Sequence, residues 1–517
     1  MSLRPLLLGA ALALGACAAG PARDGHALVL DAASAESRTR SAIERIEALN
    51  PRLNAVIGVE PAAIAEARAL DRGWAARGPL FGMPILVKDN IETRGTLPTT
   101  AGSLALKDNV TGRDAPLVAR LRAAGAVIVA KTNLSEWANM RSSDSISGWS
   151  PVGGQTRNPH ALDRNACGSS TGSAVAVAAG MAPAAIGTET DGSITCPAAV
   201  SGIVGFKPSV GLVSRTHIIP ISRSQDTPGP MTRTVRDAAL VLAAMAGTDP
   251  ADRATREGDG RRTDYAAALS DRSLQGKRIG VMRFATGFGT EAAFEEALAT
   301  LRREGATLVD IDKFEGREEI GKAEFAVLLA EFKDGINAYL ATTPPAVRTR
   351  TLADLIAFNQ ANAATEMPLF GQDVFEQAEK TKGLDEPGYR TARSTSLRMA
   401  GPEGIDRLLR EHKLDALVGP TMSPAWLIDA VHGDQTPGGG GGSLAAVAGY
   451  PHLTVPMGIV KGLPVGLSFI GPKWADALIL SLGYDYEQAS RKRVEPALIP
   501  SVEQSDDVAR AFEPAAR

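Results

Sequence analysis

The sequence predicts an α/β fold, because strand-like apolar runs alternate with helix-like segments along its first half. Two strands are expected, at 85–87, which reads Ile-Leu-Val, and at 126–130, which reads Ala-Val-Ile-Val-Ala. A helical pattern precedes each of them, one over 62–76 and one that begins at Pro116 and ends at Gly125. This alternation favours α/β over the all-α and all-β classes.

Local signals indicate the remaining elements of the first half. Apolar residues at helical spacing predict a helix over 34–49, which should stop before Pro51. Asp114 is an N-cap residue type and should cap the helix that has Pro116 in its first turn. Residues 173–179 predict a buried helix whose N-terminus faces a serine turn, where the helix dipole favours negative charge.

The second half of the chain has weaker signals. Apolar runs predict strands at 277–282 and 414–419, the second of them closed by Pro420. Residues 323–413 should be mostly helical. The glycine run 438–442 should be a mobile loop, either a plain surface connector or a flexible rim of a substrate cleft.

The composition is that of an ordinary soluble surface. The chain has 517 residues, a net charge of −3 and 22% charged residues. It therefore lacks the excess of basic residues that would indicate a nucleic-acid-binding protein. Length alone suggests two or more domains, but no internal repeat or long linker divides the chain. No cluster of His, Cys and Asp has metal-ligand spacing, so we expect no metal.

The N-terminus has the pattern of an export signal. A positive start at Arg4 precedes the apolar run 6–14, which is too short to span a membrane and suits a signal peptide. Residues 14–17 read Leu-Gly-Ala-Cys and resemble a bacterial lipobox, in which Cys17 is lipidated after cleavage. We therefore expect a periplasmic protein with a possible lipid anchor at the membrane; the alternatives are an ordinary secretory signal and no export.

Two turns of small residues carry serines. Residues 167–173 read Cys-Gly-Ser-Ser-Thr-Gly-Ser, and residues 187–193 read Gly-Thr-Glu-Thr-Asp-Gly-Ser. Serines in such turns can expose a hydroxyl nucleophile and backbone N–H donors, which acyl transfer needs. Upstream, Lys88 follows an apolar run, and burial could lower its pKa enough to make it a base. Taken alone, Lys88 could also be a surface lysine paired with Asp89, and the serines could be a helix cap and a turn residue.

Ordered blocks along the chain resemble the amidase signature family, serine hydrolases with a Ser–Ser–Lys triad. Together with the serine turns these blocks run from about residue 34 to residue 490. The blocks are residues 82–89, 131–137, 156–159, 202–208, 448–451 and 454–456.

The resemblance implies a role for each candidate residue. Ser193 is similar to the family's nucleophile, and Ser169 to the bridging serine that the family holds through a cis peptide bond. Lys88 corresponds to the base. The resemblance further implies an oxyanion hole made of the backbone N–H groups of Thr190, Asp191, Gly192 and Ser193. No cofactor is needed for this chemistry.

The resemblance also implies the domain plan. We expect a signal peptide and lipobox over 1–17, a flexible tether over 18–30, one amidase signature domain over 31–500 and a C-terminal tail over 501–517. The domain should contain a large mixed twisted β-sheet covered by α-helices on both faces. We expect a monomer.

Residues around the nucleophile indicate the substrate. Glu189 and Asp191 stand where many family members have Asp and Gly, and either could be structural or could shape the pocket electrostatically. The blocks 189–197 and 224–230 are similar to the bacterial peptide amidase branch, which removes the C-terminal amide of peptides. The expected product is ammonia. The alternatives are a general amidase for small aliphatic or aryl amides and, from another class, a non-catalytic exported peptide-binding lipoprotein.

Residues 168–172 also fit the G-x-S-x-G elbow of α/β-hydrolases, which would make Ser170 the nucleophile. That elbow should follow a buried strand, whereas residues 158–165 here are a polar loop. We therefore expect Ser170 to cap or support the turn. The elbow would need a histidine partner, and the candidates are His217, His412, His432 and His452.

Three cysteines are too few for a disulfide framework. If Cys17 is lipidated, Cys167 and Cys196 remain, each within three positions of a candidate serine. The sequence does not show whether these two side chains can meet. We expect two buried free thiols, and a disulfide in an oxidising compartment is the alternative.

Overall fold

The computed structural model describes residues 33–512 except 74–77, 288, 439 and 506–507. The predicted signal peptide, the lipidation site Cys17 and the tether lie outside the described residues. No helix in the described part of the chain is long and apolar enough to cross a membrane.

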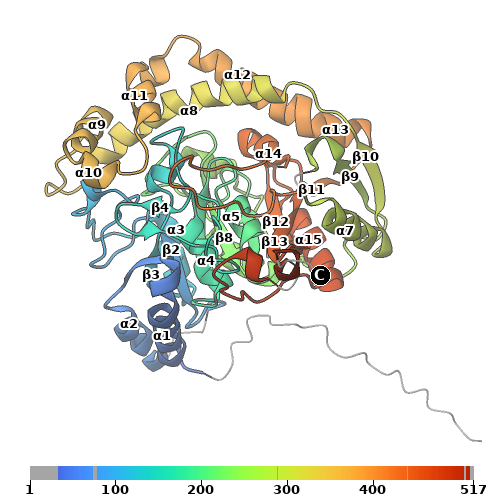
Figure 1. The fold of residues 1–517 in the computed structure, drawn as a ribbon, viewed down its shortest axis with the longest axis horizontal. Coiled ribbons are helices and arrows are strands. Elements are labelled where there is room, and N and C mark those ends of the chain that lie inside the picture. The colour runs from blue at the N-terminus through green and yellow to red at the C-terminus, as the bar shows by residue number, and fades with distance from the viewer. Residues whose placement is uncertain (1–32, 74–77, 288, 439, 506–507, 513–517) are drawn as a thin grey trace, which may run out of the picture.

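An 11-stranded mixed sheet forms the centre of the molecule (Figure 1). Its pairs β2·β3, β2·β6, β9·β11 and β9·β10 are parallel, and the other neighbours are antiparallel. In spatial order the strands are β1 (Val56–Val59), β3 (Val127–Thr132), β2 (Pro84–Lys88), β6 (Ala184–Glu189), β8 (Thr227–Thr232), β7 (Val204–Lys207), β12 (His452–Val460), β13 (Leu463–Ile470), β11 (Ala416–Pro420), β9 (Arg278–Met282) and β10 (Thr307–Ile311). A separate hairpin pairs β4 (Trp149–Ser150) with β5 (Gly154–Gln155).

Helices cover both faces of the sheet, as the alternating side chains of β2 show. Ile85 and Val87 belong to one hydrophobic cluster, which contains residues of α3, α6, α7 and α15, whereas Leu86 belongs to another, which contains residues of α1, α2 and α4. The helices are α1 (Ala35–Leu53), α2 (Ala63–Arg72), α3 (Pro116–Ala123), α4 (Thr171–Ala178), α5 (Thr195–Val200), α6 (Val235–Met245), α7 (Glu291–Arg303), α8 (Arg317–Leu340), α9 (Leu352–Ala361), α10 (Ala363–Glu366), α11 (Asp373–Lys380), α12 (Tyr389–Ala400), α13 (Asp406–Glu411), α14 (Gly442–Ala448) and α15 (Asp476–Ser490). The predicted α/β class and the two-faced helical cover are confirmed.

Helices α8 to α13 follow one another between β10 and β11 and form an arc along one side of the molecule (Figure 1). They confirm the prediction that residues 323–413 are mostly helical. Phe332 of α8 and Phe375 of α11 stack 5.2 Å apart, and Trp137 lies edge-on to Phe375 at 5.8 Å. These contacts join the arc to the loop that follows β3.

The predicted strands are all present, as β2, β3, β9 and β11, and the buried helix is α4. Three predictions about helix ends are wrong. The helix predicted over 62–76 ends at Arg72, because the chain turns out of the helix at Gly73, whose N–H donates to the Leu70 carbonyl at 3.1 Å. Helix α1 continues through Pro51 to Leu53, because its last turn is held by Asn54, whose N–H donates to the Asn50 carbonyl at 2.8 Å. Asp114 does not cap α3; its carboxylate accepts the Arg94 N–H at 2.7 Å and lies 3.1 Å from Arg122.

The glycine run is not a plain surface connector at its C-terminal end. Gly440 and Gly441 are buried, and the last glycine, Gly442, begins α14. The Gly440 N–H donates to the Thr421 carbonyl at 3.2 Å, and its carbonyl accepts from Arg317 at 3.3 Å. These contacts connect the run to β11 and to the start of α8.

Candidate active site

Lys88 is the last residue of β2, between the parallel strands β3 and β6, and its side chain is fully buried. Its Nζ lies 2.8 Å from Ser169 Oγ and 3.0 Å from Ser170 Oγ. It also lies 2.9 Å from Thr188 Oγ1 and 3.3 Å from the Thr188 carbonyl oxygen. Burial lowers the pKa of Lys88 to about 7, against the opposing attraction of Asp226 and Glu189. A large fraction of this amine is therefore neutral near pH 7.

The hydrogen bonds around Lys88 direct its lone pair. The Ser170 hydroxyl donates to the Thr188 carbonyl at 3.0 Å and accepts the Thr188 N–H at 3.1 Å. Since its one proton is already used, Ser170 can only accept from Lys88. The second N–H of a neutral Lys88 faces the two oxygens of Thr188. The lone pair is then left for Ser169, whose hydroxyl can donate its proton to the amine.

The two serine turns lie against each other. Ser169 is fully buried just before α4, and its peptide bond with Gly168 is cis, as the resemblance implies. Ser193 lies in the turn between β6 and α5 with 8% of its surface exposed. The Ser170 N–H donates to the Ser193 carbonyl at 3.1 Å. The fold thus brings together both serine turns and Lys88, which come from segments far apart in the sequence.

The turn that ends at Ser193 presents backbone N–H groups. Glu189 holds both ends of this turn together, because its Oε2 accepts the N–H groups of Ile194 and Thr195 at 2.8 and 2.9 Å. Gly192 has φ +79°, a conformation that favours glycine. Within the part of the chain that the structure describes, the N–H groups of residues 190–193 donate to no other protein atom. Free donors beside a serine can stabilise an oxyanion.

Besides Glu189, two acidic side chains contact this turn or belong to it, Asp226 and Asp191, and they differ in role. Asp226 accepts the Thr190 hydroxyl at 2.6 Å and two further backbone N–H groups, so it fixes the start of the turn. Burial raises the pKa of Asp226 to about 6. Burial also raises the pKa of Asp191 to about 6, against a hydrogen bond from Ser443 near the N-terminus of α14. Glu189 and Asp226 are therefore structural, whereas Asp191 connects the turn to the region of the glycine run.

Sequence reasoning missed Thr188, Asn90 and Asp226. Thr188 lies in β6, and Asn90 donates to its hydroxyl at 3.0 Å. These two residues and Asp226 line a cavity of about 30 Å³ beside Ser169, which has room for about one water molecule. Asn90 lies two positions after Lys88, and Thr188 lies one position before Glu189. Their closeness to these candidate residues at the ends of β2 and β6 was the signal that could have identified them.

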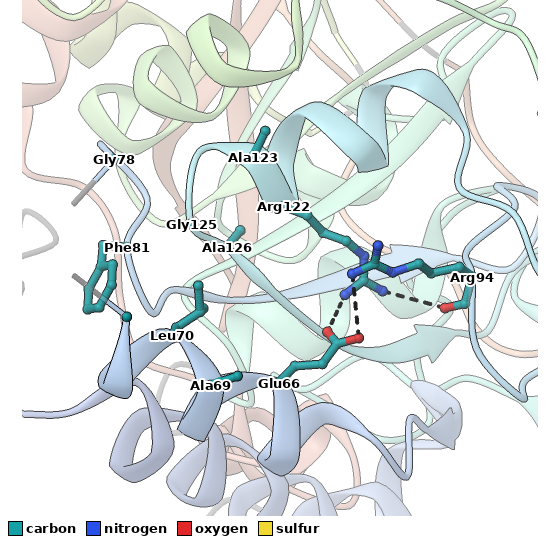
Figure 2. Close-up of a pocket in the computed structure, with 11 residues that line it drawn as sticks. Glu66, Ala69, Leu70, Gly78, Phe81, Arg94, Arg122, Ala123, Gly125 and Ala126 are labelled. Carbon is teal, nitrogen blue, oxygen red and sulfur yellow. Dashed lines mark hydrogen bonds and ion pairs between the residues drawn. The ribbon is translucent and has the colours of Figure 1, made fainter. Parts of the chain in front are cut away.

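A larger pocket lies away from these residues (Figure 2). Its volume is about 360 Å³, and it lies at the amino ends of β2 and β3, whereas Lys88 is at the carboxyl end of β2. In its wall, Glu66 forms ion pairs with both Arg94 and Arg122. None of the predicted site residues lines this pocket.

The prediction of two free thiols is wrong, because Cys167 and Cys196 form a disulfide. Their Cα atoms are 6.0 Å apart although 29 positions separate them in the sequence. The serine turns that carry them meet through the Ser170–Ser193 hydrogen bond, a contact that the sequence alone does not reveal.

Among the described residues, no histidine forms a hydrogen bond with Ser170, whose partners are Lys88, Thr188 and Ser193. His452 contacts Ser468 at 2.6 Å, His432 pairs with Asp429 at 2.8 Å, and His217 lies 4.0 Å from Glu92. Ser170 itself is fully buried and shares its hydrogen bonds between Lys88 and Thr188. The structure places Ser170 as a support of the turn.

Comparisons with known proteins show which family the chain resembles over most of its length. The family described as Amidase matches residues 37–480. A probable amidase of Arabidopsis thaliana is 40% identical over 472 residues, which cover 88% of this chain and 87% of that protein. The native peptide amidase of Stenotrophomonas maltophilia is similar in structure, with 51% identity, a TM-score of 0.86, and coverage of 90% of this chain and 96% of that one. An amidase family protein of Bacillus anthracis is also similar in structure, with 36% identity, a TM-score of 0.80, and coverage of 90% of this chain and 89% of that one.

Proposed function

The chain belongs to the amidase family and is a hydrolase of amide C–N bonds, and from this premise we propose that it removes the C-terminal amide of peptides through an acyl-enzyme on Ser193. The observation that carries the mechanism is the 2.8 Å contact between Lys88 and Ser169, beside a turn with free N–H groups. The support for the substrate is the likeness to the peptide amidase of Stenotrophomonas maltophilia.

In the proposed first step, neutral Lys88 takes the proton of Ser169, and Ser169 takes the proton of Ser193. Ser193 Oγ then attacks the carboxamide carbon, and the negative charge that forms on oxygen lies against the N–H groups of residues 190–193. Each such donor is worth about 10²–10³ in rate. The proton returns through Ser169 to the leaving nitrogen, and ammonia departs.

The second step releases the peptide acid. Water attacks the acyl-enzyme while the Lys88–Ser169 pair accepts its proton. The same pair returns this proton to Ser193 Oγ as the bond between the acyl carbon and Ser193 Oγ breaks, so the Ser193 hydroxyl and the neutral amine are both restored. Glu189 and Asp226 contribute by holding the turn of residues 190–193 in place.

The substrate is tested with one peptide in two forms, a C-terminal amide and a free acid that contains an internal glutamine. We expect ammonia from the C-terminal amide alone, with Ser193→Ala as the inactive control. Ammonia from the internal glutamine would contradict a C-terminal specificity. If neither form reacts while Ser193 still takes a fluorophosphonate probe, the peptide amide is excluded and small aliphatic or aryl amides become the substrate class.

We also propose that the protein is exported and carries lipid on Cys17. The Cys167–Cys196 disulfide supports export, because structural disulfides persist in oxidising compartments. In a bacterial host, a clickable fatty acid should label the wild-type chain in the membrane fraction. Cys17→Ala should abolish this label. A wild-type chain that stays unlabelled in the periplasmic fraction would mean an ordinary secretory signal.

A further inference from the structure

We propose that the Cys167–Cys196 disulfide positions the two catalytic serines relative to each other, so that amide hydrolysis depends on its oxidised state. Cys167 lies two residues before Ser169, and Cys196 lies three residues after Ser193. The disulfide is therefore a covalent link between the turn that holds the bridging serine and the turn that holds the nucleophile. The proposal rests on the Lys88–Ser169–Ser193 assignment but not on the identity of the amide substrate.

Each cysteine is fixed to the serine turn beside it. The Cys167 N–H donates to Asn165 Oδ1 at 2.7 Å, and its carbonyl accepts the Thr171 hydroxyl at 2.6 Å in the first turn of α4. The Cys196 N–H donates to the Gly192 carbonyl at 2.8 Å, within the turn that ends at Ser193. A displacement of either sulfur is thus transmitted to the neighbouring serine turn.

The two turns are otherwise anchored to different parts of the molecule. Ser169 contacts Lys88 at the end of β2, while the Ser193 turn is closed by Glu189 at the end of β6. Three direct hydrogen bonds join them. The Ser170 N–H donates to the Ser193 carbonyl, and the Ser170 hydroxyl donates to the Thr188 carbonyl and accepts the Thr188 N–H. All three involve Ser170, and each can open and re-form with small motions of the turns, whereas the covalent link opens only on reduction. The disulfide is therefore the more permanent constraint on the serine-to-serine geometry.

The disulfide is largely buried but retains a small exposure to solvent. Both cysteines are 7% exposed and belong to a hydrophobic cluster with Val200 and Trp426. Trp426 is fixed in place, because its indole N–H donates to Asp434 at 3.0 Å and its carbonyl accepts the Asn165 N–H at 2.7 Å. Reduction should therefore be slow and should become measurable at high concentrations of a dithiol.

Dithiothreitol reduces the Cys167–Cys196 bond by thiol–disulfide exchange. A thiolate of dithiothreitol attacks one sulfur of the bridge, and a mixed disulfide forms as the other sulfur leaves as a thiolate and is protonated. The second thiol of the reagent then displaces the protein sulfur. The products are two protein thiols, on Cys167 and Cys196, and one cyclic oxidised reagent.

Loss of the link should impair catalysis more than binding. A misplacement of about 1 Å in a reacting group can cost about 10²-fold in rate. We therefore expect kcat on a peptide amide to fall by about 10- to 100-fold with KM nearly unchanged. Binding should survive because the two cysteines pack in a hydrophobic cluster with Val200 and Trp426 and neither lines the cavity beside Ser169.

The first test uses Cys167→Ser, Cys196→Ser and the double variant. Because one bond is lost in each case, all three should show the same fall in kcat. Dithiothreitol should lower the wild type to this level and leave the double variant unchanged. Single effects that add in the double variant, or activities that match the wild type, would overturn the proposal.

A second readout separates positioning from general loss of folded protein. A carboxamide needs a proton on its leaving nitrogen, whereas a p-nitrophenyl ester of the same acyl group does not. The variants should lose more activity on the amide than on the ester, and an equal loss on both would mean a merely structural role. The labelling rate of Ser193 by a fluorophosphonate is measured in parallel. Wild-type enzyme that labels but releases no ammonia would exclude the peptide amide and leave the comparison of variants valid on the ester.

Discussion

Ser193→Ala should lower kcat on a peptide amide by about 10⁴-fold or more and should abolish labelling by a fluorophosphonate. The reason is that the acyl-enzyme cannot form without the Ser193 hydroxyl, while the free N–H groups of residues 190–193 retain only a small residual effect. Ser193 is 8% exposed and lies in a turn, so alanine should not disturb the fold. Ammonia release and intact-mass measurement of the probe adduct check both expectations.

Ser170→Ala is the matched control for this prediction. Its hydroxyl is used by Thr188 and Lys88, so its loss should weaken the enzyme but leave probe labelling on Ser193. Full labelling of Ser193→Ala together with loss of labelling in Ser170→Ala would contradict the assignment. The elbow around Ser170 would then hold the nucleophile.

Lys88→Ala should lower kcat by about 10²- to 10⁴-fold, the range typical of a lost general acid–base. Lys88→Met controls for the cavity that alanine would leave in this buried site, and it should be as inactive as Lys88→Ala. Thermal unfolding measures the fold independently. An unfolded Lys88→Met variant, or one with near-normal activity, would make Lys88 a structural residue.

The pH dependence of the wild type is part of the same prediction. Burial lowers the pKa of Lys88 from 10.5 to about 7, so the base is protonated and inactive below that pH. The kcat/KM on an uncharged peptide amide should fall about tenfold per pH unit below pH 7 and level off above it.

The free energy of unfolding should also depend on pH because the pKa of Lys88 differs between the folded and unfolded states. Between pH 7 and 10.5 the folded state binds fewer protons at Lys88 than the unfolded state, so this residue makes stability rise with pH in that window. Lys88→Met removes this contribution. At neutral pH the variant should therefore unfold at the same or a higher temperature than the wild type, although it is inactive.

Local patterns were sufficient to predict where the candidate residues lie in the fold, whereas their catalytic roles came from the family resemblance. Lys88 follows the apolar run of β2, and a lysine at the end of a buried strand can be desolvated wherever the helices lie. The serine turns were recognisable because small residues leave backbone N–H groups accessible. Both the α/β class and the position of Lys88 at a strand end depend on local patterns.

The contacts between distant segments could not be predicted in this way. The Cys167–Cys196 disulfide depends on how the two serine turns meet, and Thr188 contacts Lys88 and Asn90 only because β2 and β6 are neighbours. Asp114 shows the same limit at a helix end. Its residue type predicts a cap, but its carboxylate instead accepts the backbone N–H of Arg94, twenty positions earlier, and lies against the side chain of Arg122 within α3.

The acyl-enzyme itself gives the most direct test of the proposed mechanism. Enzyme mixed with a peptide amide is quenched in acid within milliseconds, digested and examined by mass spectrometry. The account predicts that the peptide acyl group, with ammonia lost, is attached to Ser193. Turnover with the acyl group on Ser170, or turnover with no covalent intermediate even in excess substrate, would contradict it.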